Sequence, residues 1–212
     1  MKKTILICVM AFFSVAAFAQ NTADKDGWIS LFDGKTFDGW KANENAESFS
    51  IEDGVIKVDG KRSHLFYVGP VMDHDFENFE FKAKVMTEPG ANSGIFFHTE
   101  YLEEGWPSKG YEVQVNQSHG DWRKTGSLYS FDDVKEVHVE DNEWYTEHII
   151  VQGDKVTIKV NGKTVVEYVE SEDKNRPENA GEKKIDRGTF ALQAHDPKSV
   201  IYYKDIKVKP LP

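Results

Sequence analysis

The sequence predicts an all-β protein folded as an antiparallel sandwich. Apolar and polar residues alternate along most of the chain after residue 20, whereas the period of an amphipathic helix is almost absent. The clearest alternation covers residues 79–85, where apolar residues are separated by charged ones. Asn161-Gly162, between two apolar-rich runs, is typical of a type I′ hairpin turn. Many short strands separated by such turns favour a sandwich of antiparallel strands.

The predicted strands follow one another along the chain, separated by turn residues such as Asp53-Gly54 and Gly153-Asp154. The strands cover residues 28–32, 48–51, 55–58, 65–68, 79–85, 145–151, 156–160, 163–169, 189–194 and 200–208. Two longer loops are expected at residues 101–110 and 170–184. The second loop is polar, so we expect it to be mobile.

Residues 1–19 have the pattern of a secretory signal peptide. Two lysines precede an apolar run that ends in the small-x-small sequence Ala17-Phe18-Ala19, and the run is too short to span a membrane. Cys8, the only cysteine, lies within this run. We therefore expect a periplasmic or secreted protein with no membrane anchor and no disulfide. Residues 20–212 are long enough for one domain and too short for two comfortable ones.

The charge pattern excludes one class of partner. The chain has a formal net charge of -10, and acidic and basic residues are interspersed along it. Removal of the signal peptide makes the protein more acidic, because that segment contains lysines and no acidic residue. Nucleic-acid binding needs clustered Lys and Arg, so nucleic acid is not an expected partner.

Three predicted strands carry pairs of residues two positions apart, which lie on the same face of a strand. Two of these strands are additional to those above, and the third pair falls at the end of the strand predicted at residues 189–194. The pairs are Phe96 with His98, Glu112 with Gln114, and Gln193 with His195. Gathered on one sheet face, they supply a carboxylate, amides, imidazoles and an aromatic ring. Each polar group left unpaired in a core would cost about 1–3 kcal/mol, so this set predicts a sugar-binding cleft on a sheet face.

Short motifs in a fixed order carry a family resemblance. They are Trp28-Ile29-Ser30-Leu31-Phe32-Asp33-Gly34-Lys35, Gly39-Trp40, Asn92-Ser93-Gly94-Ile95-Phe96-Phe97, Gly110-Tyr111-Glu112-Val113-Gln114, Gly126-Ser127-Leu128-Tyr129, Glu143-Trp144, Asn161-Gly162, Gln193-Ala194-His195 and Lys204-Asp205-Ile206-Lys207-Val208. Together they resemble the 3-keto-disaccharide hydrolase family, formerly a domain of unknown function. The resemblance covers essentially all of residues 20–212 and implies a concanavalin A-like jelly-roll β-sandwich. The chain departs from the family at His98, where many members carry Arg, and at Asp196-Pro197, where many carry Gly.

The resemblance implies an exported enzyme that cleaves 3-keto-glycosides or 3-keto-disaccharides. Its pathway partner would be a glycoside 3-dehydrogenase, which oxidises the C3 hydroxyl of the sugar beforehand. A ketone at C3 acidifies the hydrogen on C2, so that a general base can form an enediolate and a general acid can assist loss of the C1 substituent. Hydration of the product makes the net reaction a hydrolysis. Such a site needs a base, an acid, and donors or a metal for the enolate charge.

The candidate residues follow from the paired strands and the family motifs. The candidate catalytic residues are Glu112 as base or metal ligand, His195 as base or acid, and His98 as an enolate donor. The candidate substrate-binding residues are Gln114 and Gln193 for sugar oxygens, and Tyr129 and Trp106 for stacking on a sugar ring. Arg123 and Lys124, in the loop after the strand that carries Glu112, are further candidates. A divalent metal ion held by His98, Glu112 and His195 is left open, because this ligand set suits a Lewis acid only where the three side chains meet.

Two other classes of function stay open. A non-catalytic carbohydrate-binding module can use the same fold, so the fold alone does not separate it from an enzyme. A conventional retaining glycosidase needs two carboxylates about 5–5.5 Å apart. The glucanases of this fold carry them as Glu-x-Asp-x-x-Glu, whereas Glu112-Val113-Gln114 offers an amide in the second position.

Overall fold

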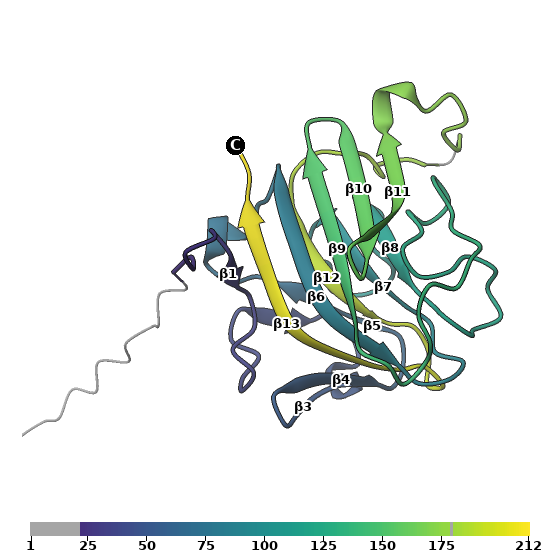
Figure 1. Cartoon of the computed structure of the whole chain (residues 1–212). Helices are drawn as coiled ribbons and strands as arrows, with labels where there is room; N and C mark the ends of the chain where they lie inside the picture. The colour runs from purple at the N-terminus through teal and green to yellow at the C-terminus, as the bar shows by residue number, and fades with distance from the viewer. Residues whose placement is uncertain (1–21, 179) are drawn as a thin grey trace, which may run out of the picture.

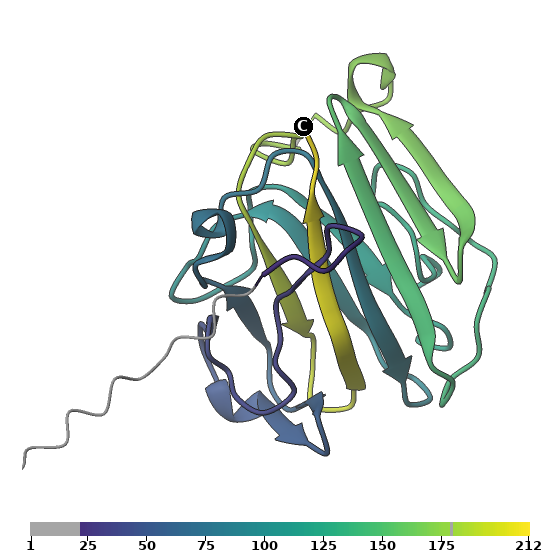
Figure 2. The same ribbon diagram turned by 60° about the vertical axis from the view of Figure 1, so that its left-hand side comes forward.

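Two antiparallel sheets stack face to face in the computed structural model, which describes residues 22–178 and 180–212 (Figure 1). The same two layers are visible from a second direction in Figure 2. The prediction of an all-β antiparallel sandwich is confirmed. The predicted signal peptide at residues 1–19 lies outside the described residues. Within those residues, no helix combines the length and the apolar character needed to cross a membrane.

The two sheets differ in size. The larger sheet has the strand order β11-β10-β9-β6-β13-β4-β3, with β1 added beside β13, and the smaller sheet has the order β2-β5-β12-β7-β8. The strands of the larger sheet are β1 (Ile29–Ser30), β3 (Phe49–Glu52), β4 (Val55–Asp59), β6 (Phe79–Thr87), β9 (Tyr145–Gln152), β10 (Lys155–Val160), β11 (Lys163–Val169) and β13 (Val200–Pro210). Those of the smaller sheet are β2 (Trp40–Ala42), β5 (Ser63–Tyr67), β7 (Ser93–Thr99), β8 (Tyr111–Val115) and β12 (Thr189–Ala194). Short 3-10 turns occur at η1 (Ala46–Ser48), η2 (Val71–His74) and η3 (Glu170–Glu172).

The predicted strands are all present, with ends displaced by a few residues. Strand β2 was not predicted, because its three residues are too few to show alternation. The hairpin prediction is also confirmed. Val160 pairs with Lys163 across a two-residue turn, and Asn161 and Gly162 have φ angles of 50° and 82°. Both angles are positive, as a type I′ turn requires.

Apolar side chains from both sheets fill the space between the layers. Phe190 on β12 lies at the centre of this core, with its ring centroid 4.7 Å from that of Phe81 on β6. In the described part of the chain, the outer face of the smaller sheet has one small separate apolar cluster, formed around Phe66, Phe96 and Ala191. The rest of that outer face is therefore free to carry polar side chains.

Glu147 on β9 is an exception within the core, because its carboxyl group is buried between the sheets. Its Oε2 accepts a hydrogen bond from the Tyr145 hydroxyl at 3.5 Å, and its Oε1 has no partner in the described chain. Burial raises the pKa of this carboxyl well above its usual range. The folded protein therefore holds a proton that the unfolded chain releases above pH about 4, and stability falls as the pH rises further.

We expect Glu147→Gln to raise the midpoint of thermal unfolding at pH 8 by about 2–4 °C, corresponding to about 1 kcal/mol. The substitution should also flatten the decline of stability with rising pH, because an amide has no proton to lose. Circular dichroism melting curves of both proteins from pH 5 to pH 9 measure this effect. Parallel stability profiles for the two proteins would contradict the expectation.

Candidate active site

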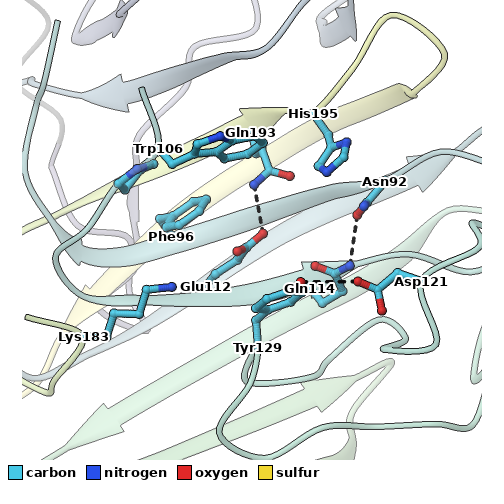
Figure 3. A pocket seen from close by; sticks show the side chains of 11 residues that line it. Asn92, Phe96, Trp106, Glu112, Gln114, Asp121, Tyr129, Lys183, Gln193 and His195 are labelled. Atoms are coloured by element: carbon cyan, nitrogen blue, oxygen red, sulfur yellow. Dashed lines mark hydrogen bonds between the residues drawn. The ribbon is translucent and has the colours of Figure 1, made fainter. Parts of the chain in front are cut away.

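A pocket of about 280 Å³ opens on the outer face of the smaller sheet. Figure 3 shows how its side chains converge from β7, β8, β12 and the neighbouring loops. The pocket is lined by Asn92, Phe96, Trp106, Pro107, Glu112, Gln114, Asp121, Tyr129, Lys183, Gln193 and His195. The structure therefore brings together most of the residues that the alternating strand pattern selected.

Strand register explains why these side chains meet. Phe96 on β7 lies opposite Glu112 on β8, and Gly94 lies opposite Gln114. Strand β12 runs along the other side of β7, with Ala191 opposite Phe96. Residues two apart on a strand share a face, so β8 and β12 project their polar side chains toward the same hollow.

Glu112 lies at the base of the pocket and reaches across β7. Gln193 Nε2 donates a hydrogen bond to Glu112 Oε1 at 2.9 Å, and Lys183 extends toward the same carboxyl (Figure 3). Burial raises the pKa of Glu112 to about 7, against the opposing effects of the Lys183 charge and the Gln193 hydrogen bond. A carboxyl with this pKa is present partly as a base and partly as an acid at neutral pH.

The Glu112 side chain has room to cross β7 because Gly94 has no side chain. A Cβ atom at Gly94 would lie 2.7 Å from Glu112 Cγ and closer still to its Oε1. Such a contact is too short, so any larger residue would force Glu112 to move. Gly94 therefore sets the position of the carboxylate.

His195 follows the end of β12 and is held by an acidic neighbour. Its Nδ1 lies 2.7 Å from Asp196 Oδ2, which also accepts a hydrogen bond from Ser199 Oγ at 3.0 Å. Burial raises the pKa of Asp196, but hydrogen bonds from His195, the Lys198 backbone and Ser199 together hold it below its usual value. The ionised carboxylate favours a proton on Nδ1, which leaves Nε2 available to a ligand.

Amides and an aromatic ring complete the pocket wall. Gln114 Nε2 donates to Asn92 Oδ1 at 3.0 Å, and the Tyr129 hydroxyl donates to Asp121 Oδ2 at 3.4 Å (Figure 3). Trp106 contributes the opposite wall, with its ring centroid 5.5 Å from that of His195. Of the candidate substrate-binding residues, Gln114, Gln193, Tyr129 and Trp106 thus line the pocket.

Arg123 and Lys124 do not line the pocket, contrary to the sequence-based hypothesis. The Arg123 guanidinium lies over the Tyr129 ring, 4.6 Å from its centroid, and its Nε donates to Asp133 Oδ2 at 3.1 Å. Lys124 Nζ donates to the backbone carbonyls of His119 and Asp121, each at 2.9 Å. Both cations therefore support the loop behind the pocket wall.

His98 is also absent from the pocket, so the expectation that it faces the cleft with Phe96 is wrong. Between Phe96 and Thr99, two residues of β7 oppose a single residue of β12, and His98 has a φ angle of 55°. This β-bulge breaks the alternation on which the prediction depended. The His98 ring packs against Phe79, its Nε2 bonds the Glu77 carbonyl at 2.9 Å, and its Nδ1 accepts from the Asp186 backbone at 3.1 Å.

The possible metal set of His98, Glu112 and His195 does not assemble, because His98 lies outside the pocket. Across residues 22–178 and 180–212, no group of three or more His, Cys, Asp or Glu side chains is arranged to hold a metal ion. The described residues therefore offer no ligand set through which a metal-dependent step can be derived.

Lys183, Asp121, Asn92 and Pro107 line the pocket but were not selected from the sequence. Lys183 belongs to the loop that was expected to be mobile. Several polar contacts tether that loop: Arg176 pairs with Glu170 at 2.9 Å and also donates to the Lys183 carbonyl. Charged residues spaced along a loop carry no local signal for such contacts, so the sequence pattern did not indicate Lys183.

The fold and the outer-face pocket define a jelly-roll sandwich of the glucanase and lectin type. A solved β-glucanase from Bacillus licheniformis superposes with a TM-score of 0.57 at 9% identity, covering 87% of this chain and 97% of that chain. This similarity concerns the fold alone. The chain belongs to the 3-keto-alpha-glucoside-1,2-lyase-like domain family, whose model matches residues 27–209.

Two relatives are similar in sequence, and the second is also similar in fold. A 3-keto-disaccharide hydrolase from Bacteroides thetaiotaomicron is 30% identical over 176 residues, which cover 70% of this chain and 61% of that protein. The chain thus spans less than two thirds of that relative. A crystal structure of a candidate glycosyl hydrolase from Parabacteroides distasonis has a TM-score of 0.76 at 25% identity, covering 91% of this chain and 99% of that chain.

Proposed function

We propose that this protein is an exported enzyme that cleaves 3-keto-glycosides or 3-keto-disaccharides by elimination and hydration. One observation carries the proposal: Glu112, with a pKa raised to about 7, lines the same pocket as a histidine oriented by Asp196. The family match and the relative named 3-keto-disaccharide hydrolase support the substrate class.

Glu112 and His195 each transfer a proton in the proposed reaction. The Glu112 carboxylate removes the hydrogen on C2, and the electron pair moves onto the C3 oxygen as an enediolate. This pair then returns to restore the C3 ketone, and C1 and C2 become doubly bonded. The C1 oxygen leaves with a proton from His195 Nε2, so His195 begins this step as the imidazolium ion, with its Nδ1 proton held by the Asp196 carboxylate. Water adds across the double bond with the roles reversed: His195 takes its proton and Glu112 returns a proton to C2. The products are the free 3-keto sugar and the released alcohol.

Other pocket residues supply charge and orientation. The Lys183 ammonium group beside Glu112 stabilises negative charge on the enediolate, and the Asn92 and Gln114 amides bind sugar hydroxyls. Tyr129 offers a ring face on which the sugar can stack. Phe96 and Trp106 narrow the pocket with apolar surface, which limits the access of water to the reacting atoms.

Two parts of the proposal lie outside this pocket. Export depends on the signal-peptide pattern at residues 1–19, and the amino-terminal sequence of protein recovered from the periplasm or medium tests it. The 3-keto group of the substrate must be supplied by an oxidation, which assigns a glycoside 3-dehydrogenase as the pathway partner.

The defining experiment compares the 3-keto and unoxidised forms of one aryl glucoside and follows release of the aryl alcohol. The proposal expects release from the 3-keto form alone, with a slower rate when C2 carries deuterium. Release from the unoxidised sugar alone would instead indicate a conventional glycosidase that uses Glu112 and Asp121. Binding of both sugars without release would indicate a carbohydrate-binding module.

The pH dependence of turnover follows from the raised pKa of Glu112. Only the ionised carboxylate accepts the C2 proton, so kcat/KM should rise about tenfold per pH unit from pH 5 toward pH 7, as Glu112 ionises. Initial rates from pH 5 to pH 8 measure this dependence at substrate concentrations well below KM. Rates that do not change between pH 5 and pH 7 would place the titrating group in the usual range of glutamate, near pH 4, and would assign the base to a group other than Glu112.

A further inference from the structure

His64 on β5 is a buried histidine that the proposed reaction does not use. Its side chain has no exposed surface, and neither ring nitrogen has a hydrogen-bond partner within the described chain. Its neighbour across the strand pair is Gln193, whose Oε1 is likewise buried without a partner in the described residues. Each buried polar group without a partner lowers the stability of the fold by about 1–3 kcal/mol. Two such groups side by side in the sheet therefore indicate a function that offsets this loss.

The position of this pair connects it to the pocket. Gln193 lines the pocket and binds Glu112 through its amide nitrogen, while its oxygen has no hydrogen-bond partner among the described residues. The Trp106 ring lies between the two histidines, with its centroid 5.3 Å from that of His64 and 5.5 Å from that of His195. The indole therefore covers His64 on the side that faces the pocket.

Trp106 is only partly buried. The residue is 46% exposed and lies in the loop between β7 and β8, and the Arg62 guanidinium lies 5.5 Å from its ring centroid. The preceding residue, Gly105, makes two hydrogen bonds to the loop after β2. Its backbone nitrogen donates to Glu44 Oε1 at 3.1 Å, and its carbonyl accepts from Asn43 Nδ2 at 3.4 Å. Rotation of the indole about its own side-chain bonds leaves both of these bonds intact.

We propose that His64 and the Gln193 amide oxygen form a second part of the substrate pocket, which binds a sugar hydroxyl group when the Trp106 indole turns aside. The proposal rests on the proposed function, since it assigns the same site a further contact to its sugar. The chemistry of the two partners is complementary: a neutral imidazole has one donor and one acceptor, Gln193 Oε1 is an acceptor, and a hydroxyl group both donates and accepts.

His64 remains neutral under working conditions. Burial lowers its pKa to about 4, and the opposing attraction of Glu44 is the smaller effect. The ring is therefore suited to hydrogen bonding and not to exchange of a proton at neutral pH, which separates its role from that of His195.

The test uses His64→Phe, with His98→Phe as a matched control. Both histidines are buried on the smaller sheet, but the His98 ring is hydrogen-bonded at both nitrogens and lies away from the pocket. His64→Phe should raise KM for a 3-keto glucoside about tenfold or more and raise the melting temperature by about 2–4 °C, because unpaired polar atoms are removed. His98→Phe should show the opposite pattern, with a lower melting temperature and an unchanged KM.

His64→Gln provides a second variant that keeps a donor and an acceptor, and its KM should stay within about threefold of the original. The unsubstituted protein provides a further readout: its ¹⁵N imidazole signals from His64 should shift when 3-keto-glucose is added. A stable His64→Phe with unchanged KM, or a His64 signal that does not respond to the sugar, overturns the inference. If the unsubstituted protein does not release alcohol from a 3-keto glucoside, the proposed function itself fails, which is a distinguishable result.

Discussion

Glu112→Gln is expected to lower kcat on a 3-keto glucoside by about 10³-fold while KM changes by less than about threefold. Glutamine has nearly the same shape, so the sugar still binds, but the amide has no lone pair basic enough to take the C2 proton. The melting temperature should not fall, because burial disfavours the ionised form of Glu112 in the folded protein. Steady-state kinetics and thermal melting, taken on the same samples, measure both effects.

Glu100→Gln is the matched control for this substitution. Glu100 follows β7, is mostly exposed, and forms a 3.7 Å ion pair with Lys109 outside the pocket. Its replacement should leave kcat and KM unchanged, because Glu100 lies outside the pocket and an exposed ion pair contributes little to the stability of the fold. A Glu112→Gln protein that retains more than a tenth of the original kcat would assign the base to a different residue.

Gly94→Ala should lower kcat/KM by about 10²-fold, although the residue bears no functional group. The added methyl carbon would overlap the Glu112 side chain, push the carboxylate away from the sheet and break its hydrogen bond to Gln193. A displacement of about 1 Å at a catalytic group costs about this factor in rate. The backbone of Gly94 does not have a positive φ, so alanine is compatible with the strand and the protein should stay folded.

Gly120→Ala separates this effect from a general cost of replacing glycine. A Cβ atom at Gly120 would have no atom of the described residues within 4 Å, and the φ angle of Gly120 is also not positive. Kinetics on the 3-keto glucoside and circular dichroism of both variants provide the comparison. Equal kcat/KM for Gly94→Ala and Gly120→Ala would show that the position of Glu112 does not depend on the missing side chain.

The β-sandwich was predictable because strand signals are local. Alternation over a few residues identified β6, and Asn161-Gly162 identified the turn between β10 and β11, without knowledge of any distant contact. The same alternation placed Glu112 and Gln193 on surface-facing sides of their strands, and the structure brings both into one pocket. It failed at His98, where a bulge inserts one residue and changes the face on which the side chain lies.

The roles of the loops were less predictable. The chain segment containing Lys183 is polar and has no period, yet its contacts with Arg176 and Glu170 bring it beside the pocket. Arg123 was expected near the sugar, but the nearby Asp133 and the ring of Tyr129 hold its guanidinium. Such pairings depend on residues that only become neighbours after the chain has folded.

The residue pattern alone was sufficient for the all-β class, the hairpin and the outward-facing positions of Glu112, Gln114 and Gln193, because each depends on neighbours a few positions away. It could not decide that Glu112 lies across Gly94 from Gln193, that His98 turns inward, or that Trp106 covers His64. These outcomes depend on strand order and register, which join segments about 80 residues apart, as in the bond between Gln193 and Glu112.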